Sequence, residues 1–169
     1  YDRGSRVPLL DNGIGTIVTD PAGDLWFSDS RGNIGRRDAN GAWNLWPHPA
    51  SAPSIIVQSL QIDPTGRLWL LYEGNGLGSM TADGTFHYVR PPPKSPLLNV
   101  YRRMAFDSSG ALWVGTYDGV MVQDTHGQVH TAPAGWHLPH GLGWPYRGPD
   151  GTFWIVAGSR IFRVDATGA

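Results

Sequence analysis

DSSGALW, at residues 107–113, is the stretch that decides the fold, because the same pattern returns three more times along the chain. It reads DPAGDLW at residues 20–26, DPTGRLW at 63–69 and GPDGTFW at 148–154. The tryptophans that end these stretches are 43, 44 and 41 residues apart. A second set of glycines keeps nearly the same spacing: Gly41, Gly84, Gly127 and Gly168. A fixed period of this length indicates a repeat architecture.

Each repeat contains two turn signals. A type I turn favours Asp, Asn or Ser at its first position, Pro at its second and Gly at its fourth, which fits residues 20–23 and 63–66. A second such signal closes the repeats at residues 38–41, 81–84, 124–127 and 165–168. Each period therefore carries two hairpins, and the fourth residue of the D-x-x-G turn, such as Gly110, is expected at a positive φ.

Short apolar or mixed runs of strand length lie between these turns. The predicted strands are residues 16–19, 25–28, 33–37 and 43–46 in the first repeat, 56–62, 68–72, 77–80 and 85–89 in the second, and 101–106, 112–116, 120–123 and 128–131 in the third. The second strand of each repeat is apolar on both faces, as in a strand buried on both sides. Four antiparallel strands in about 42 residues make one β-propeller blade, so the fold class is all-β.

The predicted organisation is a single β-propeller region over residues 1–169. Its blades are expected at about 12–48, 54–90, 98–132 and 140–169, with residues 1–10 as an extra outer strand. Pairing of Arg6–Leu10 with the strand at Ile161–Val164 would close a small ring. The alternative is a partial propeller whose end blades associate with another copy or with missing blades. Because the chain begins with Tyr1 rather than Met, we expect a fragment of a longer protein.

The composition argues against several classes of function. A net charge of −1 with only 16% charged residues, and no run of Lys or Arg, leaves no electrostatic footprint for nucleic acid. No apolar stretch is long enough for a membrane span, so we expect membrane attachment only through segments outside this chain. The chain has no cysteine, which excludes disulfides and thiolate metal sites.

The D-x-x-G-x-L-W motif followed by an aliphatic strand resembles the two-component regulator propeller repeat of bacterial hybrid histidine kinases and diguanylate cyclases. The third repeat is most similar, since residues 107–120 include the segment WVGTYDG. The resemblance implies a ligand-sensing, non-catalytic module of a signal-transduction receptor, placed in the periplasm or outside the cell. The other three repeats depart from the family pattern after Trp, and Gly148 stands where the family has Asp.

Those departures are similar to a second family, the virginiamycin B lyase-like propellers. GPDGTFW at 148–154 and NIGR at 33–36 resemble its repeat. This resemblance implies a metal-assisted lyase, which would need His and Glu converging on a metal. The only glutamate is Glu73, and the one metal-like pair, His137 and His140, has no nearby carboxylate. We therefore expect no catalytic residue, no metal and no cofactor, with the lyase and a protein-interaction scaffold as the alternatives to sensing.

The candidate binding surface follows from propeller geometry. Loops that lead into each first strand and loops that join the second strand to the third share one end of the blades, while the D-x-x-G turns lie elsewhere. Mixed aromatic and hydrogen-bonding residues on loops held by a rigid scaffold are typical of binding surfaces, although ordinary solvated loops have the same composition. The candidate ligand-binding residues are Asp29, Arg31, Tyr72, Glu73, Asn75, Arg102, Tyr117, Asp118, His140 and Arg160. The expected partner is a small molecule or a glycan, with self-association through the end blades.

Overall fold

The computed structural model describes residues 13–72, 76–89, 100–116, 119–131 and 143–164, and every regular element in these ranges is a strand. The first repeat contains β1 (Ile14–Thr19), β2 (Leu25–Asp29), β3 (Ile34–Arg37) and β4 (Trp43–Trp46). The second contains β5 (Val57–Ile62), β6 (Leu68–Tyr72), β7 (Gly76–Met80) and β8 (Phe86–Val89). The third contains β9 (Val100–Phe106), β10 (Leu112–Thr116), β11 (Gly119–Gln123) and β12 (Val129–Thr131). The fourth contains β13 (Gly143–Arg147), β14 (Phe153–Ala157) and β15 (Arg160–Val164).

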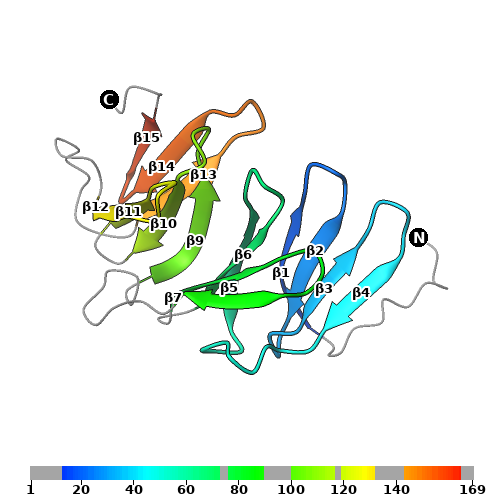
Figure 1. The fold of residues 1–169 in the computed structure, drawn as a ribbon. Coiled ribbons are helices and arrows are strands. Elements are labelled where there is room, and N and C mark those ends of the chain that lie inside the picture. Colours follow the sequence, from blue (N-terminus) through cyan, green and yellow to red (C-terminus); the bar gives the residue numbers. More distant parts are fainter. Residues whose placement is uncertain (1–12, 73–75, 90–99, 117–118, 132–142, 165–169) are drawn as a thin grey trace.

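Each repeat forms its own antiparallel sheet in which consecutive strands are neighbours, as a propeller blade requires. The four sheets, named blades 1 to 4 in chain order, lie side by side along an open arc, with β1–β4 and β13–β15 at opposite ends (Figure 1). The innermost strands follow one another, since β1 contacts β5, β5 contacts β9 and β9 contacts β13. The predicted all-β propeller fold is confirmed, and the predicted strands match to within two residues at each end.

The D-x-x-G turn owes its recurrence to a carboxylate that binds both the turn and the tryptophan. In blade 3, Asp107 Oδ1 accepts hydrogen bonds from the backbone N–H groups of Ser109 and Ala111 at 2.9 and 3.0 Å. Its Oδ2 accepts one from the indole N–H of Trp113 at 2.7 Å. Asp63 binds Trp69 in the same way at 2.9 Å. The acid is therefore six residues before the tryptophan because one side chain satisfies the turn and anchors the indole.

The fourth residue of this turn is a glycine for a conformational reason. Gly23, Gly66, Gly110 and Gly151 have φ values of +87°, +84°, +85° and +82°. This left-handed region costs other residues roughly 1–2 kcal/mol, but glycine adopts it freely. The sequence-based expectation of positive φ is confirmed at all four positions.

Three apolar cores lie between neighbouring blades rather than within them. Between blades 1 and 2 the core includes Trp26, Ile34, Leu68, Leu70 and Tyr72. Between blades 2 and 3 it includes Leu71, Met104 and Met121, and between blades 3 and 4 Trp113, Phe153 and Ile155. A strand such as β6 faces a core on each side, so its residues are apolar at successive positions.

The predicted outer strand at Arg6–Leu10 and its pairing partner cannot be compared, because residues 1–12 lie outside the described residues. Blades 1 and 4 each keep one face that no other described blade covers (Figure 1). On blade 4 this face carries Trp144, Tyr146 and Ile161, which are 39%, 52% and 69% exposed. Within the described ranges, the chain contains no helix with the length and hydropathy that a membrane span requires.

Candidate functional site

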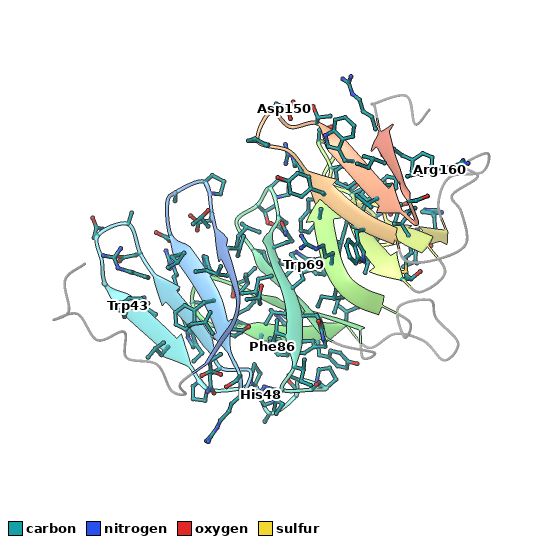
Figure 2. All side chains as sticks on the ribbon, turned by 180° about the vertical axis from the view of Figure 1, so that it is seen from behind. Trp43, His48, Trp69, Phe86, Asp150 and Arg160 are labelled. Carbon is teal, nitrogen blue, oxygen red and sulfur yellow. The ribbon has the colours of Figure 1, made fainter. Side chains whose placement is uncertain are left out.

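The candidate site is the loop face, defined as the β2–β3 and β14–β15 loops, the adjoining ends of β6, β7, β10 and β11, and the connection at residues 47–56. Antiparallel pairing puts these loops at the ends of the strands opposite the D-x-x-G turns, which join β1 to β2, β5 to β6, β9 to β10 and β13 to β14. Figure 2 shows His48, on the loop face, and Asp150, on a D-x-x-G turn, at opposite ends of the molecule. The expected separation of loops and turns is therefore observed.

Asp29 builds the first of these loops. Its side chain is buried, and Oδ1 accepts hydrogen bonds from the backbone N–H groups of Arg31 and Asn33 at 2.9 and 3.0 Å. Its Oδ2 accepts a third from Asn33 Nδ2 at 2.7 Å. Gly32 completes the turn at φ +75°, where an added Cβ would lie 2.7 Å from the carbonyl oxygen of Ile55. Asp29 thus shapes the loop and presents little surface of its own.

Asn33 connects this loop to the next blade. Its Oδ1 accepts a hydrogen bond from the backbone N–H of His48 at 2.8 Å, across 15 residues of sequence. His48 lies in the connection after β4. Its Nδ1 is buried and has no hydrogen-bond partner among the described residues. Neither Asn33 nor His48 was a predicted ligand-binding residue, and their contact across 15 residues has no signature in the sequence.

Two predicted arginines are exposed on loops of the loop face. Arg31 lies in the β2–β3 loop, and Arg160 begins β15 directly after the β14–β15 turn. They belong to the first and last blades of the arc (Figure 1). Each brings a guanidinium that can form paired hydrogen bonds with carboxylate or phosphate groups or donate to sugar hydroxyls.

Tyr72 has a different setting from the one predicted. It is 0% exposed, belongs to the core between blades 1 and 2, and packs edge-to-face against Phe86 with ring centroids 6.5 Å apart. Burial raises the pKa of its hydroxyl well above the ordinary value, so it stays a neutral phenol. The hydroxyl has no hydrogen-bond partner among the described residues. In this structure Tyr72 therefore offers no surface to a ligand.

The remaining predicted residues cannot be placed. Glu73, Asn75, Tyr117, Asp118 and His140 lie outside the described residues. Arg102 is on β9, but its side chain is outside the description as well. The described residues contain no group of three or more His, Asp or Glu side chains that could hold a metal ion.

A buried ion pair of blade 1 lies away from the loops. Asp24 is buried and forms an ion pair with Arg36, whose guanidinium also lies over the ring of Trp26 at 5.3 Å. The hydrogen bond from Arg36 holds the pKa of Asp24 below its usual value, against the opposing effect of burial. Since both charges are satisfied within blade 1, this pair belongs to the framework.

The comparisons with known proteins agree with this architecture. Residues 95–118, which include β10, match the family model described as two component regulator propeller. No curated protein matches the chain. Among solved structures, a catalytically inactive virginiamycin B lyase from Staphylococcus aureus with quinupristin is 20% identical over 95% of this chain, with a TM-score of 0.70. This chain spans about half of the lyase, covering 56% of it.

Two further structures come from cell-surface proteins. The extracellular domain of a protein described as a hybrid two component system of B. thetaiotaomicron is 19% identical over 92% of this chain, with a TM-score of 0.64, and 22% of that domain is covered. PorZ, a surface component of the type-IX secretion system of Porphyromonas gingivalis, is 16% identical over 92%, with a TM-score of 0.65 and 26% covered. At these identities the likeness establishes the fold. The chain is thus a β-propeller whose third repeat matches the two component regulator propeller family.

Proposed function

We propose that this chain is part of a ligand-sensing propeller in a bacterial two-component-type receptor, outside the cytoplasm. The observation that carries the proposal is the family match at residues 95–118. It is supported by the similarity to extracellular domains of B. thetaiotaomicron proteins described as two component systems. The expected ligand is a small molecule or a glycan that binds across the loop face.

The geometry of the loop face suits such a role. The carboxylate of Asp29 holds the β2–β3 loop by accepting three hydrogen bonds. Asn33 links this loop to the connection that leads to blade 2. A loop fixed in this way loses little conformational entropy when a ligand binds. The exposed guanidinium of Arg31 is therefore carried by a preorganised support.

A screen by thermal unfolding tests the ligand-sensing part of the proposal. Oligosaccharides and small metabolites would be added singly, and a ligand at 100 times its Kd should stabilise the domain by about 2.7 kcal/mol. Arg31→Ala and Arg160→Ala should reduce this stabilisation, while Arg67→Ala, an exposed arginine beside a D-x-x-G turn, should leave it unchanged. A hit that responds equally to all three substitutions would contradict binding at the loop face.

The location is tested separately, in cells that produce the full-length protein. Protease added to intact cells or spheroplasts should cleave a propeller outside the cytoplasm while leaving a cytoplasmic marker intact. Cleavage only after complete lysis would contradict the location without bearing on ligand binding.

A lyase is the second candidate, favoured by the TM-score of 0.70 to virginiamycin B lyase over 95% of this chain. Its test is direct: quinupristin is incubated with the full-length protein, with Mg²⁺ or Mn²⁺ and with chelator, and the products are followed by mass spectrometry. We expect no metal-dependent turnover. Conversion of quinupristin that depends on His140 would replace the sensing proposal.

A further inference from the structure

A pocket of about 410 Å³ opens at the turn end of the molecule, between blades 2 and 3 and opposite the loop face. Its apolar lining comes from Trp69, Phe106 and Leu112, and its polar lining includes Asp63, Gln123 and Asp124. This volume is within the range of small-molecule sites, about 300–1,000 Å³. None of its lining residues was predicted to bind a ligand.

The equivalent space between blades 1 and 2 is filled by a side chain of blade 1. There the indole of Trp46 stacks on Trp26, with ring centroids 5.8 Å apart and planes at 11°. It also lies against Gly84, where an added Cβ would come within 2.1 Å of Trp46 Nε1. By their places in the repeat, Trp26 and Gly84 are the counterparts of Trp69 and Gly127, which both line the pocket.

The register explains why the pocket is open between blades 2 and 3. Trp46 pairs with Ile34 across β3 and β4, and the corresponding pair across β7 and β8 is Val89 with Leu77. Val89 packs on the apolar core but carries only a short side chain. The indole supplied by blade 1 is therefore missing from blade 2, while the aromatic platform, here Trp69, is retained.

The polar lining indicates the charge of the occupant. Asp63 and Asp124 are carboxylates, and no lysine or arginine is among the described residues that line the pocket. The side-chain oxygen Oε1 of Gln123 is buried and has no hydrogen-bond partner among the described residues. Because this oxygen has almost no exposed surface, the ligand's charge is set by the two carboxylates, of which Asp124 also contacts His130 Nε2 at 3.0 Å. A positively charged group would complement them.

We propose that the pocket between blades 2 and 3 binds a planar aromatic amine, with its ring on Trp69 in the manner of Trp46 on Trp26. The ligand's ammonium group faces the carboxylates of Asp63 and Asp124. The pocket lies at the opposite end of the blades from the loop face. It is therefore a second site that stands whether or not a ligand binds the loops.

The test uses tryptamine, a cationic indole, and indole-3-acetate, which has the same ring and a negative charge. Isothermal titration calorimetry of the purified chain should detect tryptamine binding, with indole-3-acetate at least tenfold weaker. Equal affinities would overturn the assignment of charge, and no binding of tryptamine at millimolar concentration would overturn the site.

Val89→Trp places an indole at the register position of Trp46 and should reduce tryptamine affinity at least tenfold. Ile17→Trp, on the exposed face of blade 1, adds the same side chain elsewhere and should not change it. Should Val89→Trp fail to fold, as judged by circular dichroism, Asp124→Asn decides: it removes a carboxylate charge that lines the pocket and should weaken tryptamine by several-fold without weakening indole-3-acetate. Tryptamine affinity that is unchanged in Asp124→Asn and in every folded Val89→Trp sample would overturn the proposal.

Discussion

Blades 3 and 4 have the same turn backbone but differ in what the turn does for the tryptophan that follows it. In blade 3 the carboxylate of Asp107 binds the indole N–H of Trp113, which is 5% exposed. In blade 4 the position of the acid is Gly148, and Trp154 receives no such bond from the described residues and is half-buried.

The turn of blade 4 nevertheless closes. The N–H of Gly151 donates to the carbonyl of Gly148 at 3.0 Å, and the N–H of Gly148 donates to the carbonyl of Thr152 at 2.8 Å. The corresponding turn in blade 3 has the same two bonds, at 3.2 and 3.0 Å. In blade 4 the N–H of Thr152 donates to Asp150 Oδ1 at 3.0 Å, and in blade 3 its counterpart, the N–H of Ala111, donates to Asp107 Oδ1 at 3.0 Å. The turn of blade 4 therefore keeps a carboxylate, and what it lacks is the anchor of the tryptophan.

The largest difference between the two blades is expected from the tryptophans themselves. Trp113→Ala should destabilise the domain by about 3–5 kcal/mol, because it removes a buried indole that lies 5.2 Å from the ring of Phe153. Trp154→Ala should cost much less, since this side chain points away from blade 3. Urea unfolding followed by circular dichroism measures both. Equal losses would show that Trp154 is as much a part of the core as Trp113.

Gly110→Val tests the backbone of the blade 3 turn. A valine at φ +85° should cost at least about 1–2 kcal/mol, because the left-handed region disfavours a β-branched residue. Space is not the cause, since the nearest atoms to an added Cβ are 3.7 Å away. Ser108→Val, at an exposed position of the same turn, is the matched control and should change stability by less than about 0.5 kcal/mol. A similar loss in both variants would contradict the role of φ.

Restoring the acid in blade 4 should increase the stability of the domain. Gly148→Asp combined with Asp150→Ser recreates the turn of blade 3 and should stabilise the domain by about 1 kcal/mol, because Trp154 gains a charge-assisted hydrogen bond. The second substitution is needed because a Cβ at position 148 would lie 2.8 Å from Asp150 Oδ1. Asp150→Ser alone should not stabilise. The prediction fails if the double variant has no higher urea midpoint than Asp150→Ser.

The smallest effect concerns pH and the acid of blade 2. Burial alone would raise the pKa of Asp63, but hydrogen bonds from Thr65 and from the Trp69 indole outweigh it and lower the pKa. Because the pKa of Asp63 is lower in the folded state than in the unfolded state, its ionised carboxylate stabilises the fold. This stabilisation is complete above the unfolded-state pKa, about 4, and is lost as the pH falls through the folded-state pKa. Stability should therefore decline on acidification below about pH 4.

Asp63→Asn isolates that contribution. The variant should lose less stability than the wild type between pH 5 and pH 3, because the carboxylate whose pKa is lowered is absent. Parallel pH profiles for the wild type and Asp63→Asn would show that Asp63 does not contribute to acid sensitivity.

The fold was largely predictable because its signals are local. The turn D-x-x-G needs only four neighbouring residues, and the tryptophan six residues after the acid is within reach of the same carboxylate. Each blade repeats these signals, so the strands, the hairpins and the positive φ of the turn glycines could all be predicted from the sequence.

The candidate site was less predictable because burial depends on the neighbouring blade. Tyr72 ends β6 next to a variable loop and was therefore expected at the surface, yet its ring is enclosed in the core shared by blades 1 and 2. The link from Asn33 to His48 likewise joins a loop to an interblade connection. Neither contact has a fixed spacing that a single repeat could reveal.

The all-β repeat, its period and its turns follow from the sequence alone, because hydrogen bonds within one blade connect residues that are near in the chain. Which surfaces of neighbouring blades are in contact, and which leave a pocket, depends on the tertiary structure. Trp46 and Val89 occupy the same register position, but the first fills a space against the next blade and the second leaves a pocket. That difference depends on side-chain volume across an interface between blades, where packing is set by shape and not by sequence spacing.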